Sequence, residues 1–463
     1  MAGGTKKARL KVRNWREYNQ ALVARGSITF WFSEEVLTHW YASGRAVKRG
    51  RPFLYSDSTV ELFLTVRELL RLPYRQTEGF VRGLLAMLNP DLGVPDFTSV
   101  AKRAAKLGIA LPLTGPAAAY GQEYKDAAQL GVDAANEKFA ADGITIELVA
   151  EDSQATAEGG VSAFNKLGAV EKAPAVMTAW SAVVAAGMPV AEDLGFALFN
   201  AGAQADSLVG ASSNVVNVLP MNGQMMSGFA KFLVEEQGYK TFAAIHTDNE
   251  GGQSAAQGFQ AAIEELGGKW LGAESIRQDA TDATTQVAKI KQLEPDFVYV
   301  QTLLVEGAST FKAIREEGLE AAVGSYAGVG ESRVIRDAGR DAYDGLFYMS
   351  HIPEDIDAVQ GLLDEIKAVD PDRTLVNQSY DSYFYATPFV YAEAIKRLRA
   401  DGAPVTGDNV LAVLREATDI EVPIIGPMDL TDELTYRSAT VIRQATDYAA
   451  DPMTDETVTT VSH

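Results

Sequence analysis

The chain has 463 residues, of which 47% are apolar and 22% charged, a composition typical of a folded protein of roughly two to four domains and not of a disordered chain. It contains no cysteine, which excludes disulfides, thiolate metal sites and cysteine nucleophiles. Its four histidines lack the spacing of metal ligands, so we expect neither a metal nor a cofactor.

The charge is unevenly distributed. Residues 1–105 carry 17 Lys and Arg against 9 Asp and Glu, a net charge of +8, so the total of −21 leaves −29 for residues 106–463. Such an asymmetry is typical of a nucleic-acid or membrane module appended to an ordinary globular body. We therefore predict two domains, 1–105 and 106–463, with separate roles.

The N-terminal segment is positively charged, but no apolar segment follows it before Asn14-Trp15. We therefore expect no secretory signal peptide. Further along, apolar residues recur at helical spacing over 60–70 and 77–88, and a third helix is predicted to start at Pro95. These features predict a small all-α segment of the helix-turn-helix type.

This segment resembles the N-terminal region of insertion-sequence DDE transposases. The resemblance is carried by Asn14-Trp-Arg-Glu-Tyr-Asn19, Leu72-Pro-Tyr-Arg-Gln-Thr-Glu-Gly-Phe80 and Val94-Pro-Asp-Phe-Thr-Ser-Val100. In that family the catalytic carboxylates lie further along, where this chain changes character, so transposition is not expected. What remains is either weak DNA binding through phosphate contacts or no function; the basic candidates are Arg67, Arg71, Arg75, Arg82, Lys102 and Arg103.

From residue 107 short apolar runs alternate with amphipathic helical patterns. The runs are Leu107–Leu113, Ile144–Ala150, Ala175–Ala179, Phe196–Phe199, Val215–Leu219, Phe242–His246, Phe297–Gln301 and Ala321–Gly324. This alternation predicts parallel sheets covered by helices on both faces, with ligands at the carboxyl ends of the strands. Polar turns follow the runs at Trp180-Ser181, Asn200–Gln204 and Thr247–Gln253, where each begins a helix whose free amide groups favour an anion such as a carboxylate.

Residues 107 to about 445 resemble the solute-binding proteins of ABC importers, specifically the branched-chain amino acid type. The resemblance is carried by Leu113-Thr-Gly-Pro-Ala-Ala-Ala-Tyr-Gly121, Glu151-Asp-Ser153, Thr178-Ala-Trp-Ser181, Ala280-Thr-Asp-Ala-Thr-Thr285 and Ile425-Gly-Pro-Met-Asp-Leu430. It implies the α/β type I periplasmic-binding fold, with two lobes joined by a hinge. Lobe 1 is expected at about 107–219 plus 348–420, and lobe 2 at about 220–347 plus 421–463.

The same resemblance implies a ligand site. Tyr120 matches an aromatic wall, Ser181 matches the serine that holds the ligand carboxylate, and Gly202 and Gln204 match backbone and side-chain contacts to the ligand. The full set of candidate ligand-binding residues is Tyr120, Trp180, Ser181, Gly202, Ala203, Gln204, Glu250 and Tyr326.

The second lobe departs from the family pattern. Gly251 stands where an aromatic residue is common, and Tyr326-Ala327 falls where a leucine-binding relative has a glutamate that pairs with the ligand ammonium. A buried ammonium without a carboxylate partner would be costly. Either Glu250, Glu306 or Glu331 substitutes for that glutamate, or the ligand lacks an amino group.

Enzymatic motifs give no alternative. Ser309-Thr-Phe-Lys312 fits Ser-x-x-Lys but lies within a helical pattern, and Gly328-Val-Gly330 lacks the third glycine of a dinucleotide fingerprint. We therefore expect a non-enzymatic binding protein that delivers a small amino acid or related carboxylate to an importer permease. The alternatives are a DNA-binding transposase remnant or an intracellular ligand sensor. The resemblance implies a periplasmic location, whereas the missing signal peptide favours the cytoplasm for this chain.

Overall fold

The computed structural model describes residues 37–41, 55–70, 72, 74–88, 92–96, 105–350, 356–376, 380–418, 420–446 and 455–461. The chain divides into two compact units, Met1–Ala104 and Ala105–His463. Within the described residues, no helix is both long and apolar enough to span a bilayer.

The first unit contains two of the helices expected from the apolar spacing, α4 (Asp57–Leu70) and α5 (Tyr74–Leu88). Phe63 of α4 and Val81 of α5 are buried together with Trp40, whose ring N–H donates a 2.7 Å hydrogen bond to the Gly93 carbonyl. Most of the predicted third helix, and the candidates Arg71, Lys102 and Arg103, lie outside the described residues. Arg82 pairs with Glu78 one turn away on α5.

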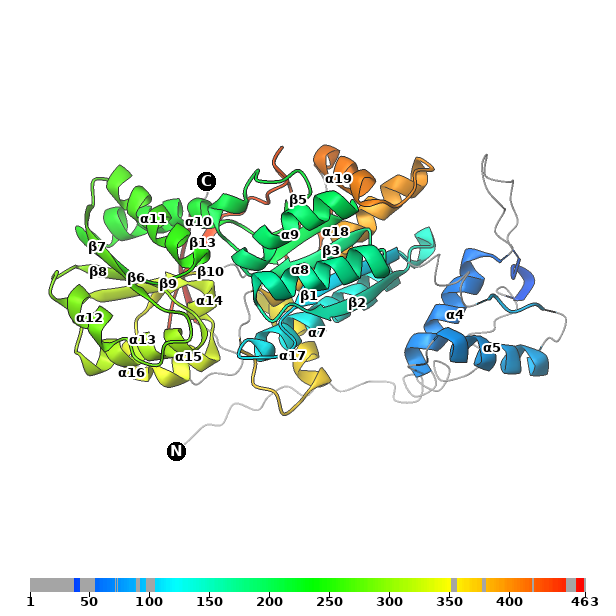
Figure 1. Ribbon diagram of the computed structural model, residues 1–463, viewed down its shortest axis with the longest axis horizontal. Helices are drawn as coiled ribbons and strands as arrows, with labels where there is room; N and C mark the ends of the chain where they lie inside the picture. The colour runs from blue at the N-terminus through cyan, green and yellow to red at the C-terminus, as the bar shows by residue number, and fades with distance from the viewer. Residues whose placement is uncertain are drawn as a thin grey trace, which may run out of the picture. The chain divides into compact units, whose positions relative to one another are not determined.

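The first lobe of the second unit is built on a five-stranded parallel sheet in the order β2-β1-β3-β4-β5 (Figure 1). The strands are β1 (Ala105–Leu111), β2 (Ile146–Asp152), β3 (Ala175–Ala179), β4 (Ala197–Gly202) and β5 (Val215–Asn217). Helices α8 (Ala157–Asn165) and α9 (Ser181–Leu194) pack together on the sheet, and α7 (Ala118–Lys138) packs against α18 (Asp381–Ala400). This lobe also contains α17 (Ile356–Val369), α19 (Gly407–Glu416), β11 (Ile420–Val422) and β12 (Gly426–Met428).

The second lobe has a seven-stranded sheet in the order β14-β13-β10-β9-β8-β6-β7. Its strands are β6 (Thr241–Thr247), β7 (Lys269–Ile276), β8 (Phe297–Gln301), β9 (Ala322–Tyr326), β10 (Phe347–Ser350), β13 (Thr440–Gln444) and β14 (Glu456–Val461). In Figure 1, α10 (Asn222–Lys231) and α11 (Glu250–Glu265) lie above this sheet, and α12 (Thr284–Lys291) and α13 (Leu304–Glu316) lie below it. Three short helices, α14 (Ala327–Gly330), α15 (Arg333–Ala338) and α16 (Arg340–Tyr343), follow β9. The parallel strands β6 to β10 repeat the order of β1 to β5, so both lobes present a topological switch point where ligands bind in open α/β sheets.

The lobe limits differ from those predicted. Strand β10 pairs with β9 and β13 of the second sheet, whereas a boundary at residue 348 would place it in lobe 1. Ile420, Met428 and Tyr436 belong to the core of the first lobe. The chain therefore crosses for the last time from the first lobe to the second after Tyr436, and not at residue 420 as predicted. The backbone of Asn217 fixes this passage, because it bonds to the Leu434 carbonyl and the Tyr436 amide at 2.9 Å.

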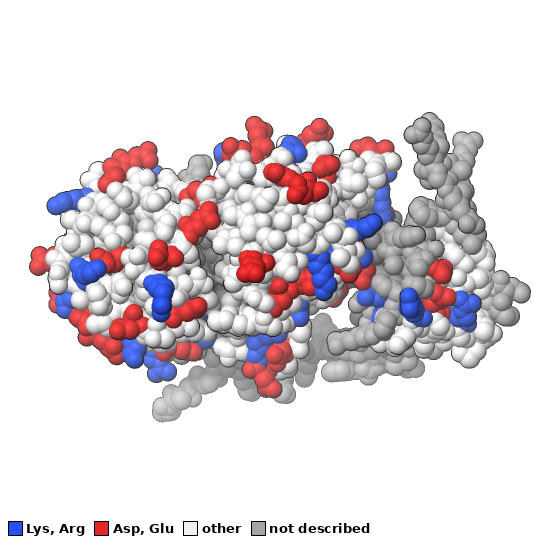
Figure 2. Space-filling view, viewed as in Figure 1, with Lys and Arg blue, Asp and Glu red and all other residues white. Residues whose placement is uncertain are grey.

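Acidic side chains are scattered, with basic ones between them, over the face of the molecule shown in Figure 2. Such a distribution is a solvated surface and not a single charged patch. It agrees with the net charge of −29 counted for residues 106–463.

Two buried carboxyl groups lie between α7 and α18. Glu123 and Asp381 are both fully buried, and Glu123 accepts a 2.8 Å hydrogen bond from the Val376 amide. Neither carboxyl oxygen of Asp381 has an N–H or hydroxyl partner within the described residues, and its polar neighbour is the Glu123 carboxyl group. Burial raises the pKa of Asp381 well above its ordinary value; repulsion from Glu123 adds to this and attraction to Arg373 opposes it. A proton held on Asp381 therefore stabilises the fold.

We expect the contribution of Asp381 to stability to fall as the pH rises above the ordinary carboxyl value near 3.8, because the folded state then binds more protons than the unfolded chain. One proton gives a slope of at most about 1.4 kcal/mol per pH unit. Asp381→Asn removes this titration, so its stability relative to wild type should increase between about pH 5 and pH 8. Urea unfolding at stepped pH measures the difference. The exposed Asp401→Asn at the end of α18 is the control and should keep the wild-type slope; the same slope in Asp381→Asn would contradict the assignment.

Candidate ligand-binding site

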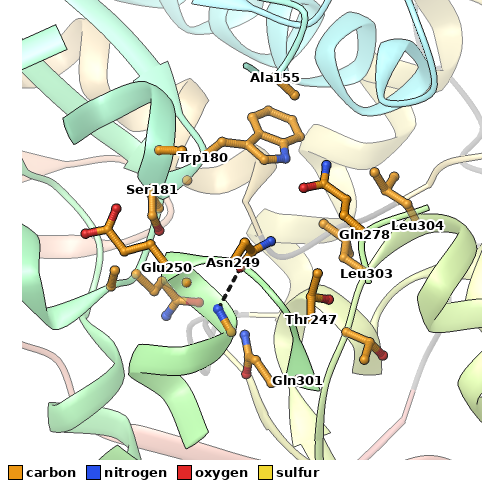
Figure 3. Close-up of a pocket in the computed structure, with 18 of the residues that line it drawn as sticks. Ala155, Trp180, Ser181, Thr247, Asn249, Glu250, Gln278, Gln301, Leu303 and Leu304 are labelled. Atoms are coloured by element: carbon orange, nitrogen blue, oxygen red, sulfur yellow. Dashed lines mark hydrogen bonds between the residues drawn. The ribbon is translucent and has the colours of Figure 1, made fainter. Parts of the chain in front are cut away.

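A cavity of about 160 Å³ lies at the carboxyl ends of strands from both sheets (Figure 3). Its lining comprises Tyr124, Ala155, Trp180, Ser181, Ala182, Gly202, Ala203, Gln204, Ala205, Asn222, Thr247, Asn249, Glu250, Gly251, Gly252, Gln278, Gln301, Thr302, Leu303, Leu304, Glu306, Tyr326 and Tyr380. A cavity of about 150 Å³ holds a molecule the size of benzene, so this one suits a small metabolite. Aromatic and aliphatic groups alternate in the wall with amide and hydroxyl groups, as is usual for small-molecule sites.

Two helix N-termini, one from each lobe, meet at the cavity. Helix α9 begins at Ser181, and its first amide groups have no partner within the helix. Helix α11 begins at Glu250 and is capped by Asn249, whose side-chain oxygen accepts a 2.9 Å hydrogen bond from the Gly252 amide. A Cβ built on Gly251 would lie 3.3 Å from the Ser181 hydroxyl oxygen, so the two N-termini lie close together. Their combined dipoles favour a negatively charged group here.

The aromatic wall comes from the first lobe. The Tyr124 ring stacks on Phe384 at a centroid distance of 4.8 Å and lies 6.2 Å from Trp180. The Tyr380 hydroxyl donates a 2.8 Å hydrogen bond to the side-chain oxygen of Gln204, whose amide nitrogen donates to the Pro220 carbonyl at 3.0 Å. Gln204 is therefore fixed in orientation at the edge of the cavity.

The opposite wall, from the second lobe, combines Leu303, Leu304 and Tyr326 with polar groups. Glu306, in the first turn of α13, is 2% exposed. Its two carboxyl oxygens accept hydrogen bonds from the Thr247 hydroxyl at 3.1 Å and the Asp279 amide at 3.0 Å. Burial outweighs these bonds and raises the pKa of Glu306. The hydroxyl of Thr302, another residue of the lining, is 1% exposed and has no hydrogen-bond partner within the described residues.

Three residues of the lining have a strained backbone. Ala155, Trp180 and Leu304 adopt left-handed conformations, with φ of 54°, 65° and 56°. Each such residue costs about 1–3 kcal/mol and persists where the surrounding structure holds it, commonly at functional sites. At Trp180 this conformation directs the chain from β3 straight into α9.

Seven of the eight candidate residues from the sequence line the cavity: Trp180, Ser181, Gly202, Ala203, Gln204, Glu250 and Tyr326. Glu250 is exposed and accepts a 2.7 Å hydrogen bond from Ser207, and its carboxylate points away from Gln278 and Leu303 in Figure 3.

Tyr120 does not line the cavity. It is buried, its hydroxyl shares a 2.9 Å hydrogen bond with the Ser332 hydroxyl, and burial raises its pKa to about 12. The aromatic wall is provided instead by Tyr124, one turn further along α7. Sequence reasoning missed Tyr124, Thr302 and Tyr380. Glu331, one of the suggested ammonium partners, also lies outside the lining.

Comparisons with known proteins agree with this architecture. Residues 104–446 match the periplasmic binding protein family, and residues 23–122 match the transposase DDE domain. The Leu/Ile/Val-binding protein homolog 3 of Brucella melitensis is 24% identical over 334 residues, which cover 71% of this chain and 88% of the relative.

Two solved structures show the same fold. A substrate-binding protein of a branched-chain amino acid transporter from Streptococcus pneumoniae, in complex with isoleucine, has a TM-score of 0.66 and 19% identity over 77% of this chain and 99% of its own. A solute-binding protein of an ABC transporter from R. palustris, in complex with benzoate, has a TM-score of 0.66 and 20% identity, covering 77% and 96%. These likenesses confirm the predicted type I fold, and the match over 104–446 shows that the chain belongs to the periplasmic binding protein family.

Proposed function

We propose that residues 105–463 capture a small carboxylate-bearing solute, an amino acid or a related acid, as the substrate-binding component of an ABC importer. The observation that carries this proposal is the meeting of the α9 and α11 N-termini at Ser181 and Gly251. The first amide groups of α9 and the Ser181 hydroxyl supply donors for a carboxylate, and the dipoles of both helices stabilise its charge. Because the two helices belong to different lobes, a bound carboxylate also holds the lobes together.

The ligands named for the relatives support this chemistry. Isoleucine and benzoate, bound in the Streptococcus pneumoniae and R. palustris proteins, share a carboxylate and differ in everything else. Binding without catalysis is supported by the lining, because none of its described residues is a His or Lys that could activate Ser181 as a nucleophile. The partner is then a membrane permease, and delivery to it requires that the protein reach the periplasm, the compartment of its family.

The test is a thermal-shift screen of the full chain against amino acids, aromatic acids and fatty acids, followed by calorimetry. Binding at 100 times the dissociation constant stabilises the native state by about 2.7 kcal/mol, so one class should raise the melting temperature. Ser181→Ala should lower the affinity for that ligand about 10- to 100-fold, because a hydrogen bond to a charged group contributes roughly this factor.

Ser162→Ala, at an exposed position on α8, is the matched control and should bind as the wild type does. Two results would contradict the proposal: no stabilisation by any carboxylate, or equal affinities in Ser181→Ala and Ser162→Ala.

A further inference from the structure

The cavity wall contains a buried acid that no basic side chain neutralises. Glu306 forms no ion pair with Lys or Arg in the described part of the chain, and its partners are the neutral donors Thr247 and Asp279 N–H. Its place in the first turn of α13 lets the helix dipole favour ionisation, against the effect of burial. A cationic group in the cavity would complete this site, because an ionised carboxylate away from water is costly unless paired.

Thr302 lies four residues before Glu306, at the end of β8, and adds a second sign that part of the ligand belongs here. Its hydroxyl is buried and without a partner within the described residues, although it lines the cavity. Buried hydroxyls in native proteins nearly always have a partner, so an orphan in a binding cavity points to a hydrogen bond completed by the ligand. A hydroxyl accepts as well as donates, so a cavity wall that offers both this hydroxyl and a carboxylate suits a group with several N–H donors.

The charged groups of the lining favour one class of ligand. Among the described residues, the lining holds two acids, Glu250 and Glu306, and no Lys, Arg or His. A bare carboxylate placed in the cavity is attracted by the helix N-termini but repelled by Glu306, because the exposed Glu250 carboxylate points outward. A zwitterion avoids this conflict, because its ammonium group neutralises the acidic wall while its carboxylate meets Ser181.

We propose that Glu306 and Thr302 form the subsite for a ligand ammonium group, and that the cavity therefore selects small amino acids over bare carboxylates. The inference rests on the proposed function for the carboxylate end of the ligand. It assigns the ammonium site to α13, whereas the family position for such a glutamate falls at Tyr326-Ala327 in this chain. The other acids suggested by the sequence serve less well: Glu331 lies outside the lining and accepts from Ser350, and Glu250 is exposed and accepts from Ser207.

The test compares each amino acid with the same molecule lacking its amino group, by calorimetry on the full chain. The pairs are alanine with propanoate, valine with isovalerate, and phenylalanine with hydrocinnamate. We expect at least one amino acid to bind more than 10-fold tighter than its partner, the gain of roughly one well-made charged interaction. Glu306→Gln should lower the affinity for that amino acid about 100-fold and should leave the affinity for the des-amino acid unchanged or higher. Thr302→Val should lower the affinity for the amino acid about 10-fold.

Glu316→Gln, at an exposed position on the same helix, is the control and should bind as the wild type does. Melting temperatures without ligand show whether each variant is folded. If Glu306→Gln is unfolded, the affinities of Thr302→Val decide the test. If des-amino acids bind as tightly as amino acids, or Glu306→Gln weakens both members of a pair equally, the subsite is wrong while the proposed function stands. If no member of any pair binds and the wider carboxylate screen also fails, the proposed function itself is wrong.

Discussion

Gly131→Ala is expected to destabilise the 105–463 unit by about 3 kcal/mol, the upper range for forcing an extra methyl group into a packed core. Gly131 lies in α7, where it faces the backbone of α18. A Cβ at this position would stand 2.2 Å from the Tyr385 carbonyl oxygen and 2.9 Å from its carbonyl carbon and Cα. Backbone atoms cannot rotate aside as a side chain can, so the two helices would have to separate. Their separation would also disturb the buried pair of Glu123 and Asp381 between them.

The matched control is Gly361→Ala, in the exposed face of α17. Apart from the backbone of α17 itself and the two neighbouring residues, no atom of the described residues lies within 4 Å of a Cβ built there, so only helix propensity changes. Alanine is favoured over glycine in a helix by about 0.5–1 kcal/mol, and Gly361→Ala should therefore be slightly more stable than wild type. Urea unfolding followed by circular dichroism measures both. Equal stabilities of the two variants would show that α7 and α18 are not in backbone contact.

The central strands could be predicted from the sequence because parallel strands buried on both faces appear as unbroken apolar runs. Ala175–Ala179 and Phe297–Gln301 coincide with β3 and β8. The same reasoning missed the edge strands β7 and β14 of the second sheet, and it also missed β10 and β13, which are short, buried and inside that sheet. An edge strand needs no continuous apolar run, so composition alone does not distinguish it from a loop.

The residues of the ligand-binding site also divide into those that could be predicted from the sequence and those that could not. Trp180-Ser181 and Gly202–Gln204 could be predicted because they directly follow strands, and the topology brings strand ends to one edge. Tyr124 and Tyr380 could not, because both lie on or beside long helices. Helical spacing gives the buried face of α7 but not which of its turns reaches the cavity. Tyr380 meets Gln204 across 176 residues of sequence, a contact that depends on how α18 packs and not on any local pattern.

Asp455→Ala is expected to lower the free energy of unfolding by about 3–5 kcal/mol, the cost of breaking a buried ion pair at one end. The Arg336 guanidinium bonds to the Asp455 carboxylate, and their side chains are 0% and 1% exposed. Tyr348 donates to the same carboxylate at 2.9 Å, and the Thr446 amide donates to it at 3.2 Å. Removing the carboxylate leaves a buried guanidinium uncompensated, whereas the stacking of Arg336 on the Tyr343 ring, at 5.0 Å, persists.

Urea unfolding gives the measurement, and Asp337→Ala is its control because Asp337 is exposed and adjacent to Arg336. The control should change stability by no more than about 0.5 kcal/mol. In the double variant Arg336→Met with Asp455→Leu both charges are gone, so much of the lost stability should return.

Asp455 directly precedes β14, the strand that closes the edge of the second sheet, and none of these residues lines the cavity. Ligand affinity should therefore survive in every variant that remains folded. A loss of affinity in folded Asp455→Ala would mean that the edge of the sheet is coupled to the cavity, and stability equal to that of Asp337→Ala would mean that Arg336 finds another acceptor.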